Sequence, residues 1–151
     1  MWLLLVHVKP EICCFFNMSK HIKWRWASLA IALLIFWFSG RNASQSTLQS
    51  DSFLFLLPFL QEDTARFLIR KLAHFTIYMV LGFCVYRSFK EPHSKWAFGL
   101  SLMLCFLYAC SDEFHQFFIA GRSAQFTDVM IDTCGALIGQ TLSYISIKKW
   151  G

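Results

Sequence analysis

The main shortage in this sequence is of charged residues. Asp, Glu, Lys and Arg make up 15% of its 151 residues, whereas in soluble domains they average about 25%. Hydrophobic residues make up 56% of the chain, more than the roughly half that is usual for a soluble domain. This balance argues against an ordinary soluble domain and favours a membrane protein.

Three other absences narrow the class of protein. No internal repeat of about 20 to 50 residues occurs, which argues for one domain and against a solenoid. The net charge of +5 is carried by short basic groups between apolar runs, without a basic face or an RNA-binding signature, so we predict no nucleic-acid partner. The six cysteines lack zinc-ligand spacing such as CxxC, and we predict that they are small buried hydrophobic residues.

Four apolar runs are bounded by charged residues. Each is slightly shorter than the roughly 20 apolar residues that a transmembrane helix needs, so flanking Lys, Arg and Trp side chains must reach the interfaces. None shows the polar stripe at about 3.6-residue spacing that a soluble helix carries. We therefore predict an all-α fold, a polytopic membrane bundle of four transmembrane helices. The runs are residues 27–39, 72–86, 96–111 and 129–147.

Basic residues flank these runs asymmetrically. They precede the first run in SKHIKWRW, join the second to the third in RSFKEPHSK, and end the chain in KKW. By the positive-inside rule these clusters face the cytoplasm, which places both termini there. The loop 40–70 and the stretch 112–128 hold most of the acids and then lie outside. Arg70 and Lys71 are the exception, so either they pair with acids or the topology is inverted.

Two further segments are interpreted from their composition. FLFLLPFL, residues 53–60, is too short to span a membrane, and its Pro58 disfavours a buried helix. We predict an interfacial or re-entrant segment over the outer face. The N-terminal MWLLLVHV lacks the basic region and cleavage site of a signal peptide. We predict that residues 1–17 are unstructured or precede the true start at Met18, and that residues 18–151 form the membrane domain.

Polar side chains recur at helical spacing near the outer ends of the last three runs. Lys71, His74 and Tyr78 follow one another at three and four residues, so they share one face of a helix. The third run repeats this spacing with Tyr108, Asp112, His115 and Gln116.

The fourth run carries a stripe of acids and small residues. Asp128, Asp132, Gly135 and Gly139 follow at intervals of four, three and four. The two glycines form a GxxxG step, which allows a neighbouring helix to approach closely. The aspartates extend the same stripe toward the outer end of the helix.

If consecutive spans are antiparallel, these outer ends meet in one polar pocket. Ionisable groups at membrane depth are costly and mark a functional site by default. Paired carboxylates can shift each other's pKa and leave one acid and one base. Arg122 could hold a phosphate or carboxylate with its planar fork. The predicted pocket contains His74, Asp112, Glu113, His115, Arg122, Asp128 and Asp132.

The same residues have a purely structural interpretation. His74 could simply bond to a neighbouring helix, Glu113 could face water, and Asp128 could stabilise a helix N-terminus. Interhelical ion pairs are the other structural option, namely Asp112 with Arg122 or Asp132 with Lys71.

A metal site is the less favoured interpretation of the cluster. His74, His115, Asp112 and Glu113 are metal-ligating residue types, but DEFHQ does not have the HExxH spacing of zinc metalloproteases. We therefore predict neither a metal nor a cofactor.

The motifs RKLAHFTIY, SDEFHQFFIAGR and DVMIDTCGALIG resemble those of the VanZ-like family of bacterial membrane proteins. The resemblance covers residues 30–145, and FWFSGRNASQ departs from the tighter SSQ turn usual in the family. It implies a small polytopic protein of the bacterial plasma membrane, in a family whose founding member is associated with teicoplanin resistance. No agreed reaction comes with it. The matching motif positions are Lys71, His74, Asp112, Glu113, His115, Gln116, Arg122, Asp128, Asp132 and Gly135.

These inferences lead to a protein of the cell envelope that binds a polar or anionic headgroup. The ligand would be a lipid-linked precursor, a phospholipid or a lipophilic glycopeptide. The alternative is a membrane-embedded hydrolase or transferase acting on a lipid-linked substrate, and ion transport is weaker because the acids lie at one interface. Lys71, Gln116, Arg122, Asp128 and Asp132 are the predicted ligand-binding residues, and His74, Asp112, Glu113 and His115 are the catalytic candidates.

Overall fold

The chain is all-α, as predicted. The computed structural model describes residues 9–41, 43–89 and 94–150, with side chains from residue 21 onward except those of residues 43–45, 95 and 150. No strand occurs in these ranges. The elements are α1 (Lys9–Ser39), α2 (Ala43–Asp51), the short 3-10 helix η1 (Leu54–Leu56), α3 (Glu62–Arg87), α4 (Lys95–Phe117) and α5 (Phe126–Trp150).

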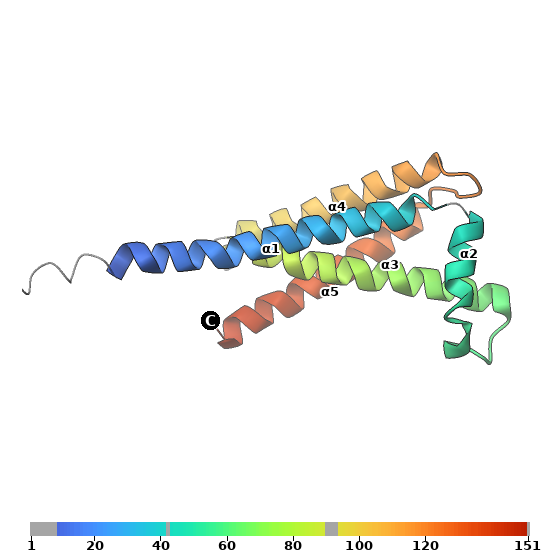
Figure 1. Cartoon of the computed structure of the whole chain (residues 1–151), viewed down its shortest axis with the longest axis horizontal. Helices are drawn as coiled ribbons and strands as arrows, with labels where there is room; N and C mark the ends of the chain where they lie inside the picture. Colours follow the sequence, from blue (N-terminus) through green and yellow to red (C-terminus); the bar gives the residue numbers. More distant parts are fainter. Residues whose placement is uncertain (1–8, 42, 90–93, 151) are drawn as a thin grey trace, which may run out of the picture.

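The four long helices lie lengthwise, and α2 lies across one end of them (Figure 1). Helices α1 and α4 run toward that end, whereas α3 and α5 run away from it. Consecutive long helices are therefore antiparallel, and α3 and α5 are parallel to each other. This arrangement brings the end of α4 and the beginnings of α3 and α5 together, as the polar-pocket hypothesis requires.

Helix α3 makes its most extensive contact with α5, and small residues make that contact possible. A methyl group at Gly135 would overlap the backbone carbonyl of Phe75, and one at Gly139 would overlap that of Met79. The GxxxG prediction is thus confirmed. Gly82 on α3 lies equally close to the backbone of α5, so the two helices approach through small residues on both sides.

The distribution of side chains is the reverse of that in a soluble bundle. Asp132, Gln140 and Ser143 are fully buried, while Leu33 and Trp37 are more than half exposed. Three helices are long and apolar enough to cross a membrane: His21–Ser39, Glu62–Arg87 and Trp96–Phe117. Helix α5 forms where the fourth span is predicted but is not among these three. Helix α5 is less apolar because it carries polar side chains, such as Asp132, Gln140 and Ser143, that are buried against the other helices.

The basic clusters meet at the end of the bundle opposite α2. Arg25 Nε of α1 donates to the Ser88 carbonyl oxygen over 3.4 Å. Arg87 Nη2 donates to Ser146 Oγ of α5 over 2.7 Å. The three basic groups therefore share one end of the molecule, as their spacing in the sequence predicted.

Helix α1 begins before the predicted membrane domain of residues 18–151, and the segment 53–60 is mostly irregular. Helix α1 begins at Lys9, so part of the segment 1–17 is helical, residues 1–8 lie outside the described residues, and the start at Met18 stays a prediction. The segment 53–60 holds only the 3-10 turn, and its Phe55 and Phe59 side chains are strongly exposed. Of the cysteines described, Cys84 and Cys105 are buried, but Cys134 lies on the outer surface of α5.

Candidate functional site

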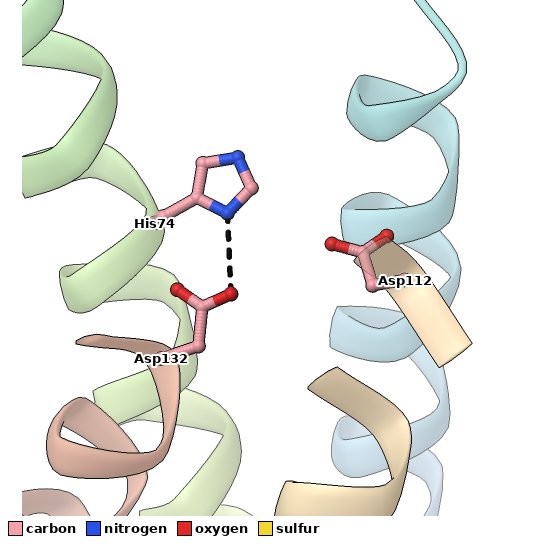
Figure 2. Close-up of side chains that lie close together, drawn as sticks. All are labelled: His74, Asp112 and Asp132. Carbon is pink, nitrogen blue, oxygen red and sulfur yellow. Dashed lines mark hydrogen bonds and ion pairs between the residues drawn. The ribbon is translucent and has the colours of Figure 1, made fainter. Parts of the chain in front are cut away.

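Three helices each contribute one side chain to a polar cluster near the end covered by α2. His74 of α3, Asp112 of α4 and Asp132 of α5 point toward one another (Figure 2). His74 Nδ1 lies 3.4 Å from Asp132 Oδ2, and one donor atom from each residue lies within 4.8 Å of the other two. Asp112 is 4% exposed and Asp132 is fully buried. The structure therefore brings together residues from three helices, and the outermost two, His74 and Asp132, are 58 positions apart in the sequence.

One turn nearer the end of the bundle, Lys71 of α3 forms an ion pair with Asp128 of α5. Their side chains are 18% and 20% exposed. The sequence suggested Lys71 with Asp132 instead. Because the two helices run parallel, each side chain on α3 meets the residue of the α5 stripe at its own level. The pairs are therefore Lys71 with Asp128 and His74 with Asp132.

Glu113 is buried, which corrects the interpretation that it faces water. Its Oε2 accepts a hydrogen bond of 2.9 Å from the backbone N–H of Gln125, so it ties α4 to the loop before α5. Gln116 donates through Nε2 to Asp112 Oδ2 over 3.3 Å. Gln116 thus orients a member of the cluster, while Glu113 turns toward the α4–α5 loop.

His115 lies apart from the other candidates. Its ring stacks on Phe36 of α1, with 4.5 Å between the ring centroids. One ring nitrogen, Nδ1, is buried without a hydrogen-bond partner. On α4, the side chain of Asp112 points toward α3 and α5, whereas that of His115 points toward α1. The structure therefore does not bring His115 to His74.

Arg122 lies in the α4–α5 loop directly after Gly121, whose φ of 76° is a conformation that glycine adopts easily. Its guanidinium donates to the Ser39 carbonyl oxygen over 3.4 Å and to Ser46 Oγ over 3.0 Å. Burial, and next the charge of Arg70, lower the pKa of Arg122 from its ordinary value, yet an arginine remains charged. Within the described residues it forms no ion pair, so the predicted pair with Asp112 does not occur.

A cavity of about 490 Å³ lies between α1, α2 and α3. Its lining includes apolar side chains such as Ile35 and Ile77. No carboxylate is present among the described residues that line it. His74 lines it too, so the three-residue cluster borders the cavity. The main polar lining residues are Ser39, Ser46, Ser50, Arg70, His74 and Arg122.

Sequence reasoning did not find this cavity or the role of α2. A signal was present, because Ser46, Gln49 and Ser50 are spaced three and four apart and so share a helix face. In the sequence, Arg70 was notable only as a basic residue on the predicted outer side, contrary to the positive-inside rule. The side chains of residues 42–45, within the serine-containing turn, lie outside those that the structure describes.

These features define a class of protein: a helical, membrane-type bundle with apolar side chains outside and a polar site at one end. Within that class the chain belongs to the VanZ/LLP1 family, whose model matches residues 24–147. The match covers all the long helices over most of their length and confirms the family resemblance of the motifs. Neither the curated proteins nor the solved structures contain a match to the chain.

Proposed function

We propose that this protein is an integral membrane protein of the bacterial plasma membrane that binds an anionic headgroup in the cavity beneath α2. The observation that carries the proposal is the charge of the lining. Arg70 and Arg122 both line the cavity, and no carboxylate among the described lining residues balances them. A ligand with a phosphate or carboxylate group would supply the missing negative charge.

Arg122 is the residue best placed to hold such a group. Among the described residues, its guanidinium donates two hydrogen bonds, both to neutral oxygens, and it has five N–H donors. The hydroxyl groups of Ser46 and Ser50 lie on the same wall and can also contact an anion. Lys71, by contrast, is already neutralised by Asp128. We therefore assign the binding of the anion to Arg122 and Arg70. Lys71 instead connects α3 to α5 through its ion pair with Asp128.

The apolar walls of the cavity suit the hydrophobic part of an amphiphile. Its apolar lining comes from α1 and α3 and includes Ile35, Phe38, Ile69 and Ile77. A cavity with a basic rim and apolar walls fits a phospholipid, a lipid-linked envelope precursor or a lipophilic glycopeptide. Binding of a lipophilic glycopeptide or of its lipid-linked target would connect this protein to teicoplanin susceptibility.

The proposed topology places α5 as a fourth span beside α3. Its polar residues Asp132, Gln140 and Ser143 are fully buried, so the lipid would meet mainly the apolar face. The end with the basic clusters would be cytoplasmic, together with both termini. The cavity would then open near the outer surface, where the apolar segment 53–60 would lie in the interface.

A second candidate function is hydrolysis or group transfer on a lipid-linked substrate. His74 lines the cavity and is held by Asp132, which is the arrangement of a general base with an orienting carboxylate. In this form of the proposal, His74 is the general base and Asp132 is its orienting carboxylate.

The experiment is a thermal-unfolding series on the full chain purified in detergent. The probes are phosphatidylglycerol, a polyprenyl phosphate and teicoplanin, with phosphatidylcholine as the zwitterionic control. A ligand that binds only the folded state raises stability by mass action, by about 2.7 kcal/mol at a hundred times its Kd. We expect an anionic amphiphile to stabilise the wild type, and Arg122→Gln to lose most of that response.

Arg41→Gln is the matched control variant. Arg41 lies at the same end of the bundle, over the Phe38 ring, but does not line the cavity. It should keep the response. Equal losses in the two variants, or no stabilisation by any probe, would contradict the proposal. Mass spectrometry of each probe after incubation separates the two functions, because catalysis releases a cleaved or transferred product.

A further inference from the structure

The cluster of His74, Asp112 and Asp132 holds two carboxylates and one imidazole, and among the described residues no Lys or Arg side chain forms an ion pair with it. If His74 is protonated, it neutralises one of the two carboxylates. Lys71 is already engaged by Asp128, and Arg122 donates to Ser39 and Ser46 instead. A buried carboxylate without a cationic partner either takes up a proton or coordinates a metal ion.

Two oxygen atoms of the cluster are also without partners. Asp112 Oδ1 and Asp132 Oδ1 are both buried and accept no hydrogen bond from the described residues. Both side chains are more than nine-tenths buried, and Figure 2 shows an oxygen of Asp112 pointing toward the other two residues. Leaving buried polar atoms unsatisfied is costly, and one cation bound between the two side chains would satisfy both oxygens.

The geometry suits a small transition-metal ion. Donors about 2.0–2.2 Å from a tetrahedral zinc ion lie about 3.4 Å from each other. His74 Nδ1 and Asp132 Oδ2 already have that separation, 3.4 Å. A ligand atom of Asp112 lies within 4.8 Å of the other two, so it would have to move closer by up to about 1.4 Å to reach the same separation.

The donor types narrow the choice of metal. One imidazole nitrogen with two carboxylates suits zinc or manganese, whereas magnesium and calcium prefer oxygen alone. Gln116 holds Asp112 by a hydrogen bond to Oδ2, as partners in the outer shell of metal sites do. Three protein ligands leave a position for water or for an oxygen of a bound anion, and His74 borders the cavity.

We propose that His74, Asp112 and Asp132 together bind one divalent transition-metal ion, of the zinc or manganese type, at the inner wall of the cavity. This donor set differs from the metal-ligating residues grouped from the sequence, which included His115 and Glu113, because those two side chains face elsewhere. The proposal does not rest on anion binding in the cavity, because the metal ligands all come from the chain.

The test is a titration of the chelator-treated full chain in detergent with Co²⁺, whose visible absorption reports its coordination. We expect one tightly bound Co²⁺ per chain, displaced by equimolar Zn²⁺ but not by excess Mg²⁺. Asp112→Asn should weaken binding at least about tenfold, the lower end of what is lost on disturbing a metal site. Glu113→Gln is the matched control, a buried carboxylate one residue away, and it should retain the full affinity for Co²⁺.

A second measurement on the wild type guards against a variant that fails to fold. Pulsed electron paramagnetic resonance of the Mn²⁺-loaded protein should detect coupling to one imidazole nitrogen. Absence of tight Co²⁺ binding by the wild type, equal losses in Asp112→Asn and Glu113→Gln, or Mn²⁺ without imidazole coupling would each overturn the proposal. No lipid is present in these experiments, so their failure would leave the anion-binding proposal to its own test.

Discussion

At the scale of single residues, the partner of each polar side chain depends on the relative register of two helices. The sequence places Lys71 and His74 on one face of α3, and Asp128 and Asp132 on one face of α5. That grouping could be predicted, because it depends only on the helical repeat. The pairing could not, since a shift of one helical turn exchanges Asp128 for Asp132.

Loss of the Lys71–Asp128 ion pair should destabilise the bundle. Lys71→Met or Asp128→Asn leaves a mostly buried charge without its partner, so each should lower the free energy of unfolding by about 1–3 kcal/mol, between the values for exposed and buried pairs. Reversible unfolding in mixed detergent micelles provides the measurement. The double variant should cost less than the two single changes together. Strict additivity would show that the pair contributes nothing.

At the scale of the elements, the four long helices were predictable and α2 was not. The long helices follow from apolar runs bounded by charge. Helix α2 is short and polar, and no apolar periodicity marks it. It is held in place by non-local contacts such as that of Ser46 with Arg122, which lies 76 residues further along the chain. The cavity depends on α2 and was therefore beyond sequence reasoning.

The α3–α5 contact can be tested through its glycines. Gly139→Ala would place a methyl group against the Met79 carbonyl of α3, forcing the helices apart. We expect a loss of about 1–3 kcal/mol in the free energy of unfolding, as for other overpacked sites. Gly99→Ala on α4 is the control, since a methyl group there meets no atom within 4 Å. It should be neutral or stabilise by up to about 1 kcal/mol through helix propensity. Similar effects of both changes would mean that close approach is unimportant.

At the scale of the whole molecule, the two ends differ in the polar and charged residues that they hold. The basic clusters lie at one end, and the cavity with its polar cluster lies at the other. The gathering of the basic clusters at one end and of the polar residues at the other could be predicted, because consecutive helices alternate in direction. Their assignment to the two sides of a membrane depends on the positive-inside rule alone.

Reporter fusions in a bacterial host test that assignment. A fluorescent protein that matures only in the cytoplasm should be bright at the C-terminus. Alkaline phosphatase, which is active only outside the cytoplasm, should be active when fused after Ser123 and inactive when fused after Ser88. The reverse pattern would establish the inverted topology, in which Arg70 and Arg122 face the cytoplasm.

The most direct test of the account is the affinity of the cavity for an anionic headgroup. Equilibrium binding of a fluorescent phosphatidylglycerol would be compared among the wild type, Arg122→Gln and Arg41→Gln, with the matching phosphatidylcholine as the zwitterionic reference, which has no net charge. Charge-assisted hydrogen bonds contribute about 1.5–3 kcal/mol, so Arg122→Gln should weaken binding by about 10- to 100-fold while Arg41→Gln leaves it unchanged. Equal affinities for the two lipids, or for the two variants, would contradict a headgroup site built around Arg122.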